Sequence, residues 1–284
     1  MNKKMVLFTL GKLLKVEAVL LLLPLVVSFI YQEHIGLSYA IVAVFVFLIG
    51  LLMSRKLPKN RNIYALPFMF TGEIPSFTDA FFETVSGFTT TGSSILSNLD
   101  GLSHASLFWR SFTHWVGGMG ILVFTVAFIP LASGRTMHIL KAEMPGPVIG
   151  KLVSKVRVTA RILYVIYAAL TLVQIILLIL GGMPVFDSIL NSFATAGTGG
   201  FSMSNEGIAV YNSAYIDGVI TTFMILFGIN FNLIYFFLIG KIAPVLKSEE
   251  LRGYLAIIAG STLLITLNIA SQYPSYLRAF RYAV

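Results

Sequence analysis

The sequence contains no cysteine among its 284 residues, and only 11% of its residues are charged. It therefore offers no disulfide framework, no thiolate metal site and no cysteine nucleophile. A soluble domain carries about 25% charged residues, so a charged fraction this low excludes an ordinary soluble fold. Hydrophobic residues make up 57% of the chain instead. This composition predicts an integral membrane protein that lies in a lipid bilayer.

Apolar segments recur along the chain, and most of them approach the roughly 20 residues that a helix needs to cross a bilayer. They are residues 5–30, 35–53, 115–131, 163–180, 214–239 and 254–269. We therefore predict an all-α, multi-pass membrane protein. Because no small-residue cleavage site follows the first segment, we interpret it as a retained helix and not as a signal peptide.

Basic residues outnumber acidic ones by 20 to 12, an excess that would suit nucleic acid binding if it formed one patch. It does not, because the basic residues gather in the connecting stretches 3–15, 55–61, 135–161 and 241–252. Short basic connections are typical of the cytoplasmic side of membrane proteins, so we expect no nucleic acid partner. The acidic connections between them should face outward.

One stretch does not fit this alternation of cytoplasmic and external connections, because it is too short to cross the membrane. Between the basic Arg61 and the acidic Glu73 the main apolar stretch is NIYALPFMFT, ten residues with a proline inside. As a helix it would span about 15 Å, which is half a membrane. Either this segment is a half-helix buried against protein, or a complete crossing is missing between Tyr64 and Leu66.

Two similar stretches lie 108 positions apart: DAFFETVSGFTTTGSS begins at Asp79 and DSILNSFATAGTGGFS begins at Asp187. Each places a short amphipathic segment before a Thr/Gly loop and a glycine-bearing apolar segment. A helix of about three turns is too short to cross, so we predict a pore helix that enters the membrane and returns through the loop. Ser76, Thr78 and Asp79 are all available as the N-cap of the first pore helix, and Asp79 and Asp187 are expected to cap the two pore helices at their N-termini.

The Thr/Gly loops carry the chemistry. Non-helical backbone survives at membrane depth only where it is buried in protein or lines water. Backbone carbonyls in such a segment replace the hydration shell of a monovalent cation, and glycine allows the backbone angles that this requires. The two loops are therefore predicted to line an aqueous cation pathway.

The stretches FTDAFFETVSGFTTTG, HWVGGMGI, MHILKAEMPGP, ATAGTGGFS and FGINFNL resemble a superfamily of potassium transporters that includes the bacterial TrkH and KtrB proteins and the plant HKT proteins, with TrkH the most similar. The family folds helix, re-entrant pore loop and helix into repeats of the potassium-channel type, four of them around one pore. The resemblance implies a selectivity filter built from Thr89, Thr90, Thr91, Gly92 and Ser93 in the first repeat and Thr198, Gly199, Gly200 and Phe201 in the second. Potassium would be bound through Thr90, Thr91, Gly92, Thr198, Gly199 and Gly200.

The resemblance also divides the chain. Residues 1–56 correspond to a leading helix pair, 57–140 to a first repeat whose outer helix is truncated, 141–246 to a second repeat, and 247–284 to an outer helix and the start of a third repeat. We interpret the sequence as an incomplete member of the family. A half-size protein that must dimerise to assemble four loops is the alternative.

Further implications of the resemblance concern partners and location. It implies potassium as the transported substrate without a cofactor, a homodimer, a cytosolic nucleotide-binding regulatory subunit similar to TrkA, and a place in the bacterial inner (plasma) membrane. The rival class is an enzyme, an intramembrane serine protease with Ser86 and His114 as its dyad. One active site would not explain a duplicated loop, so we favour the transporter. Glu17, inside the first apolar segment, is expected to have a packing partner such as Lys12 or Arg110.

Overall fold

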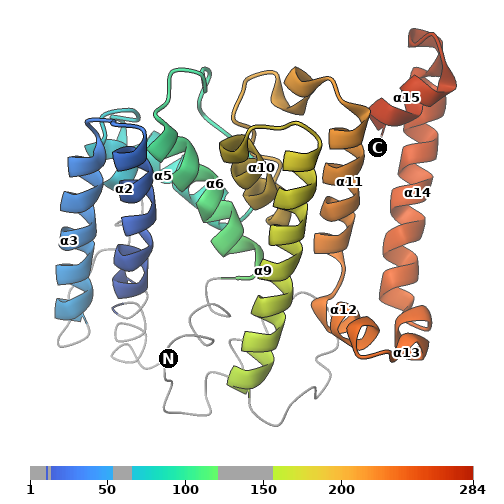
Figure 1. Ribbon diagram of the computed structural model, residues 1–284, viewed down its shortest axis with the longest axis horizontal. Helices are drawn as coiled ribbons and strands as arrows, with labels where there is room; N and C mark the ends of the chain where they lie inside the picture. Colours follow the sequence, from blue (N-terminus) through green and yellow to red (C-terminus); the bar gives the residue numbers. More distant parts are fainter. Residues whose placement is uncertain (1–10, 12–13, 54–65, 121–155, 284) are drawn as a thin grey trace. The chain divides into compact units, whose positions relative to one another are not determined.

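The structure is a computed structural model that describes residues 11, 14–53, 66–120 and 156–283 (Figure 1). Regular structure in these residues is entirely helical, as predicted. Two of the described helical segments are long and apolar enough to cross a membrane, Ala160–Leu180 and Glu249–Gln272. A third crossing results if α11 (Ala214–Gly228) and α12 (Phe231–Leu238), which meet at 100°, form one broken span.

The chain folds into two compact units, and each is described by itself. The first comprises Met1–Ile121 and Ile189–Gly207, and the second comprises Leu122–Ser188 and Ile208–Val284. The first unit contains α2 (Leu22–Ile30), α3 (Gly36–Met53), α4 (Leu66–Phe70), α5 (Phe77–Phe88) and α6 (His104–Gly118). The boundary between the units runs through α10 (Val185–Ala196), so most of α10 and the loop after it belong to the first unit.

A buried cluster holds the first unit together around α6. Its largest members are Trp109 and Phe112 of α6, Tyr39 of α3 and Phe68 of α4, none more than 4% exposed. The Tyr39 hydroxyl lies 3.0 Å from that of Ser106, which joins α3 to α6 by a hydrogen bond inside this cluster. The cluster packs against one face of α6, and α6 also contacts α5, the first pore helix, so that its position beside α5 is fixed.

The N-terminus of α6 is fixed by a carboxylate. Glu33, in the turn between α2 and α3, accepts hydrogen bonds from the backbone N–H groups of His104 and Ala105 at 2.7 and 3.2 Å. These N–H groups have no partner inside the helix, and a negative charge is favourable at this end of a helix. Glu33 therefore attaches the leading helix pair to the start of α6.

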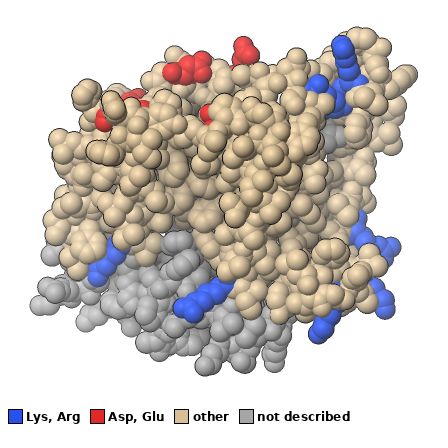
Figure 2. All heavy atoms as spheres, in the orientation of Figure 1, with Lys and Arg blue, Asp and Glu red and all other residues tan. Residues whose placement is uncertain are grey.

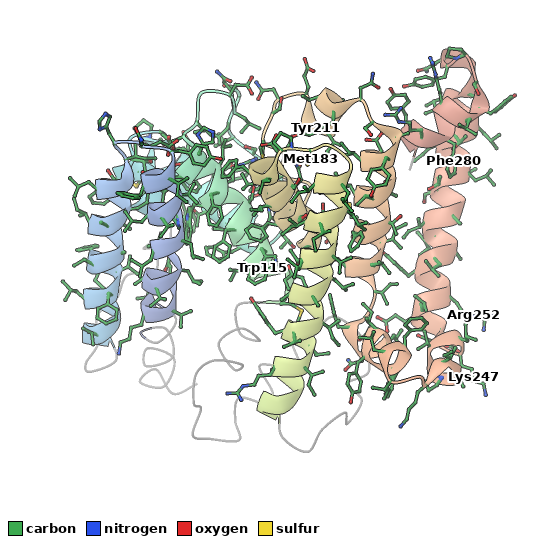
Figure 3. The ribbon with its side chains drawn as sticks, in the orientation of Figure 1. Trp115, Met183, Tyr211, Lys247, Arg252 and Phe280 are labelled. Atoms are coloured by element: carbon green, nitrogen blue, oxygen red, sulfur yellow. The ribbon has the colours of Figure 1, made fainter. Side chains whose placement is uncertain are left out.

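The second unit packs α9 (Val156–Leu180) against α11 through Leu178, Met183, Ile216 and Ile220. Met183 and Tyr211 lie on neighbouring connections at one end of this packing (Figure 3). Aromatic contacts extend the packing of α9 against α11, since the ring of Tyr167 lies edge to face with the rings of Phe227 and Phe231. The chain then continues through α13 (Ile242–Leu246), α14 (Glu249–Ile269), the short η3 (Ala270–Gln272) and α15 (Tyr276–Ala283).

Two predicted helix limits are wrong. The apolar segment 214–239 was expected to be one crossing, but Ile229 is extended and the Asn230 side chain caps a new helix by accepting from the N–H of Asn232 at 3.0 Å. Helix α6 starts at His104, eleven residues before the predicted apolar segment, because Ser103 caps it and the fold buries its polar residues Ser106, Arg110 and His114. Residues 121–131 of that segment lie outside the described residues.

The segment NIYALPFMFT is described only from Leu66 onward. This part forms the five-residue helix α4, and Phe68 is buried at 1% exposure in the cluster around α6. This part is thus a short helix packed against protein through Phe68, and both interpretations of the whole segment stay predictions. Residues 62–65 lie outside the described part of the chain.

Candidate functional site: two paired Thr/Gly loops

The two predicted pore helices have equal length. α5 and α10 each contain 12 residues and start 108 positions apart, as the sequence repeat requires. Ser76, with extended backbone, is the N-cap of α5, and its hydroxyl accepts from the N–H of Asp79 at 3.5 Å. The prediction that Asp79 caps this helix is therefore wrong, because Asp79 already lies in its first turn.

Asp187 likewise lies in the first turn of α10, two residues after the helix begins at Val185. Its carboxylate accepts a hydrogen bond from the Tyr211 hydroxyl at 2.6 Å. Both aspartates still place a negative charge at the positive end of a pore helix, which stabilises these helices. Neither one is the first residue of its helix.

The backbone of the two loops repeats as well. The φ angle is positive at Thr90 (54°) and Gly92 (77°), and again at Thr198 (53°) and Gly200 (73°). Thr91 and Gly199 between them do not have positive φ. The hydrogen bonds that start each loop also correspond, from Thr90 N to Gly87 O at 3.0 Å and from Thr198 N to Thr195 O at 2.8 Å.

This alternation is unusual for L-amino acids. A left-handed backbone costs a residue with a side chain about 1–2 kcal/mol, and a β-branched threonine is a particular outlier there. Two such threonines at matching positions therefore mark a constrained segment, of the kind that clusters at functional sites. Alternating left- and right-handed residues form concave nests in which successive N–H groups point to one side, so that carbonyl oxygens are free to align on the other.

The two loops meet at their glycines. A Cβ atom added to Gly92 would overlap the carbonyl oxygen of Gly199, so the Gly92 Cα and this carbonyl are in direct contact. A Cβ added to Gly199 would collide with the imidazole of His114. Of the predicted filter residues, Gly92 and Gly199 are therefore brought together. A Cβ at Gly200 would meet nothing within 4 Å.

Hydroxyl groups brace the first loop. Thr89 donates to the Val85 carbonyl at 2.7 Å, and its oxygen lies 2.8 Å from the hydroxyl of Thr91. Because Thr89 has already donated its only proton, Thr91 is the donor in this second bond. The Ser93 carbonyl accepts from the Ser86 hydroxyl at 2.5 Å, so Ser93 is held by the protein at the end of the loop.

These contacts leave no serine protease dyad. Ser86 is 3% exposed and donates to Ser93, while both ring nitrogens of His114 lack a hydrogen-bond partner among the described residues. A dyad requires the nucleophile and the base to be hydrogen-bonded. The His114 ring instead stands edge-on to Phe201, with centroids 3.9 Å apart.

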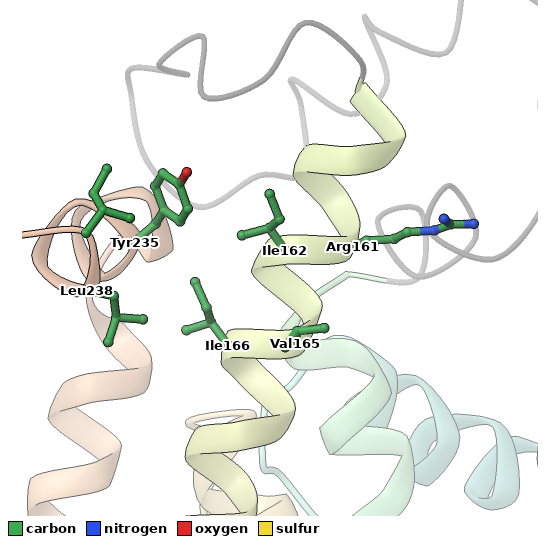
Figure 4. A pocket seen from close by; sticks show the side chains of 7 residues that line it. Arg161, Ile162, Val165, Ile166, Tyr235 and Leu238 are labelled. Atoms are coloured by element: carbon green, nitrogen blue, oxygen red, sulfur yellow. The ribbon is translucent and has the colours of Figure 1, made fainter.

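Other candidate sites in the described part of the chain are weak. No group of three or more His, Asp or Glu residues is placed to hold a metal ion there. A cavity of about 360 Å³ between α9 and α12 has Ile162 and Ile166 facing Tyr235 and Leu238, while Arg161 points away from it (Figure 4). No carboxylate lines this cavity, so it does not suit a calcium or magnesium ion.

The residues that sequence reasoning missed are a buried pair behind the loops. Glu83 of α5 and Arg110 of α6 are 0% and 3% exposed in their side chains, and Arg110 Nε lies 2.5 Å from Glu83 Oε1. The expectation that Arg110 pairs with Glu17 is wrong, since the buried Glu17 carboxylate has no hydrogen-bond partner among the described residues. Lys12, the other expected partner, lies outside the described residues. The signal in the sequence was a charged residue within each of the two segments that form α5 and α6.

Comparison with known proteins gives consistent matches. The family model for TrkH, a cation transport protein, matches residues 56–271. The Trk system potassium uptake protein TrkH of Salmonella typhimurium is 39% identical over 210 residues, which cover 72% of this chain and 43% of that protein. The Trk system potassium uptake protein TrkG of Escherichia coli K12 is 35% identical over 210 residues, with 73% and 43% covered.

A solved structure agrees with the whole described fold. The crystal structure of the potassium transporter TrkH from Vibrio parahaemolyticus superposes with a TM-score of 0.83 at 28% identity, and covers 100% of this chain and 63% of that one. The chain spans about two fifths of the length of the curated relatives named above. These matches confirm the predicted resemblance and the predicted all-helical membrane fold. The chain therefore belongs to the TrkH family of cation transport proteins.

Proposed function

We propose that this protein takes up potassium ions across the bacterial inner membrane, and that its two Thr/Gly loops form part of the selectivity filter. This proposal rests on one observation. The backbone is left-handed at Thr90 and Gly92 in the first loop, and again at the matching Thr198 and Gly200 in the second. The names of the relatives, potassium uptake proteins of a Trk system, support potassium as the ion.

The chemistry of the loops supports a cation site. The carbonyls of Thr90, Thr91 and Gly92 and those of Thr198, Gly199 and Gly200 would replace part of the hydration shell of potassium. Each loop follows the C-terminus of a pore helix, the negative end of the helix dipole, which favours a cation. Two loops supply only part of a ring of ligands, so further loops of the assembly would complete it.

Partners and organisation follow from the same proposal. The equal spacing of α5 and α10 supports two pore-loop repeats at 57–140 and 141–246, after a leading helix pair and before an outer helix. We further propose a homodimer and a cytosolic nucleotide-binding regulator similar to TrkA, because the relatives belong to a named system. Potassium is the substrate in this proposal, and neither a cofactor nor an enzymatic activity is part of it.

Potassium uptake by cells that lack their own uptake systems tests the proposal. The protein is expected to restore growth at low potassium and to take up potassium in preference to sodium. Gly92→Ser is expected to lower the ratio of potassium to sodium uptake, because its side chain would displace the Gly199 carbonyl.

Gly72→Ser is the matched control, since Gly72 also has positive φ (79°) but lies outside the loops, with open space around it. Normal membrane insertion without potassium uptake would refute the proposed function. An unchanged uptake ratio in Gly92→Ser would refute the role of the first loop.

A further inference from the structure

The buried pair of Glu83 and Arg110 is connected to both Thr/Gly loops. Burying two charges costs several kcal/mol for each ion unless good geometry and further hydrogen bonds compensate for the lost water. Such a pair is weak evidence for stability by itself, because apolar residues of similar volume often serve as well. The remaining hydrogen bonds of the two side chains therefore indicate what the pair does.

Glu83 holds the end of the first loop. Its carboxylate accepts from the hydroxyl of Ser94 at 3.0 and 3.1 Å, and from the backbone N–H of Ile95 at 3.1 Å. These residues directly follow Ser93, the last predicted filter residue of the first repeat. The carboxylate thus fixes the chain where it leaves the first loop.

Arg110 holds the end of the second loop. Its Nη1 donates to the Ser202 carbonyl at 2.7 Å, and its Cζ lies 3.6 Å from the centroid of the Phe201 ring. A guanidinium over an aromatic face adds a cation–π attraction, which is larger where both groups are buried. Phe201 is 3% exposed and directly follows Gly200. The Arg110 side chain therefore contacts both residues at the end of the second loop, Phe201 and Ser202.

The second repeat has no charged residues at the two positions that correspond to this pair. At the spacing of the pore helices, Glu83 corresponds to Asn191. α6 and α11 are both 15 residues long and follow a serine N-cap, and at their spacing of 110 positions Arg110 corresponds to Ile220. The ion pair of Glu83 and Arg110 in the first repeat therefore contacts the loops of both repeats.

We propose that Arg110, held by Glu83, is a positioning residue for ion selectivity: it fixes the ends of both loops and so keeps Gly92 against Gly199. This inference rests on the proposed function. Arg110 does not ligate the ion. Glu83 does not ligate it either, because its carboxylate is occupied by the guanidinium, a hydroxyl and a backbone N–H.

A double variant separates positioning from mere stability. Arg110→Gln alone would leave the Glu83 charge buried without its partner, which strongly destabilises a protein. Glu83→Gln combined with Arg110→Gln removes both charges and keeps an oxygen that accepts from Ser94 and Ile95. The contacts to Ser202 and Phe201 are lost, because glutamine is shorter and has no guanidinium plane.

The double variant, in the full-length protein in its membrane, is expected to insert at normal abundance. Its ratio of potassium to sodium uptake is expected to fall about tenfold, since positioned ligands tolerate displacements of only about 0.5 Å. The control is Asn205→Ala, which breaks another bond between the same loops, from Leu99 N to Asn205 Oδ1 at 3.1 Å, and leaves Arg110 in place. This variant is expected to keep the ratio of the unaltered protein.

A second readout does not depend on transport. Because the sequence has no cysteine, spin labels on Ser97→Cys and Glu206→Cys report only the distance between the exposed parts of the two loops. The distance distribution is expected to be narrow with Arg110 present and broader in the double variant.

Either an unchanged uptake ratio or an unchanged distance distribution in the double variant would overturn the proposal. If the unaltered protein carries no potassium, the proposed function fails, and with it the role in selectivity. The spin labels then still decide whether the pair fixes the loops.

Discussion

Gly92 and Gly200 occupy equivalent positions in the two repeats, but they are required for different physical reasons. Both have a left-handed backbone, which a residue with a side chain adopts at a cost of about 1–2 kcal/mol. Gly92 has a second requirement, because any Cβ there would overlap the Gly199 carbonyl, whereas Gly200 faces open space. Equivalent glycines therefore tolerate substitution unequally.

Alanine at each position tests this difference. Gly92→Ala is expected to abolish selective potassium uptake, since it combines the backbone cost with a displaced carbonyl. Gly200→Ala is expected to weaken uptake only partly, by no more than the roughly 5- to 30-fold that 1–2 kcal/mol allows. Uptake of potassium and sodium by cells with equal amounts of each variant measures both effects. Equal losses would show that the contact with Gly199 does not matter.

At the residue scale, sequence reasoning found the backbone of the site better than its side chains. The Thr/Gly composition predicted where non-helical backbone lies, because glycine and its spacing encode backbone freedom locally. Glu83 and Arg110 lie on two different helices and 27 positions apart, so no local sequence pattern predicts that they pair. The N-cap of α5 was uncertain for a related reason, since Ser76, Thr78 and Asp79 all suit a cap and only the fold selects Ser76.

Helices α5 and α6 approach closely because each carries glycine where the other comes nearest. A Cβ at Gly87 would collide with the Thr113 hydroxyl, and one at Gly117 with the Phe88 carbonyl. Small residues allow this kind of backbone approach between helices in membranes. The contact matters for the site, because Phe88 is the last residue of α5 before the first Thr/Gly loop.

Alanine at Gly117 is expected to destabilise the protein by about 1–3 kcal/mol, the usual penalty for overpacking. Gly218→Ala in α11 is the control, because a Cβ at this helical glycine would meet nothing within 4 Å. It is expected to be neutral or to stabilise by up to about 1 kcal/mol, since alanine is the better helix former. Thermal unfolding in detergent measures both, and equal melting temperatures would contradict the close packing of α5 and α6.

At the element scale, the existence of helices was predictable and their limits were less so. Apolar segments of crossing length located α3, α9 and α14. Hydropathy cannot show a break inside an apolar segment, so the bend between α11 and α12 was missed, and Asn230 was its only sign. The start of α6 was also missed, because its first turns are polar in sequence and buried only by the fold.

Basic residues gather at one end of the second unit. Lys247 and Arg252 lie where α14 begins, together with Glu249 and Glu250 of its first turn, whereas Tyr211 lies at the opposite end of the unit (Figure 3). Basic side chains are visible over the start of α14 in Figure 2. Arg278 and Arg281 of α15 are exceptions, and Arg281 is paired with Asp217 at 2.6 Å. The positive-inside rule then assigns the Lys247 end of this unit to the cytoplasm.

Cysteine labelling tests this orientation on a background without native cysteine. Asn212→Cys and Lys247→Cys are exposed positions at the two ends of the second unit. A maleimide that cannot cross membranes is expected to label Asn212→Cys on intact cells, and Lys247→Cys only after the cells are opened. The reverse pattern would contradict the assigned orientation.

The contact between Gly92 and Gly199 also constrains the order in which the chain matures. The two glycines lie 107 positions apart, and a ribosome adds about 5–20 residues per second. Glu83 receives its partner Arg110 after only 27 residues, so its charge is neutralised early in synthesis. The first loop waits roughly 5–20 s for the second to be made. During that interval the first loop lacks its contact with the Gly199 carbonyl, which forms when the second repeat follows it out of the ribosome.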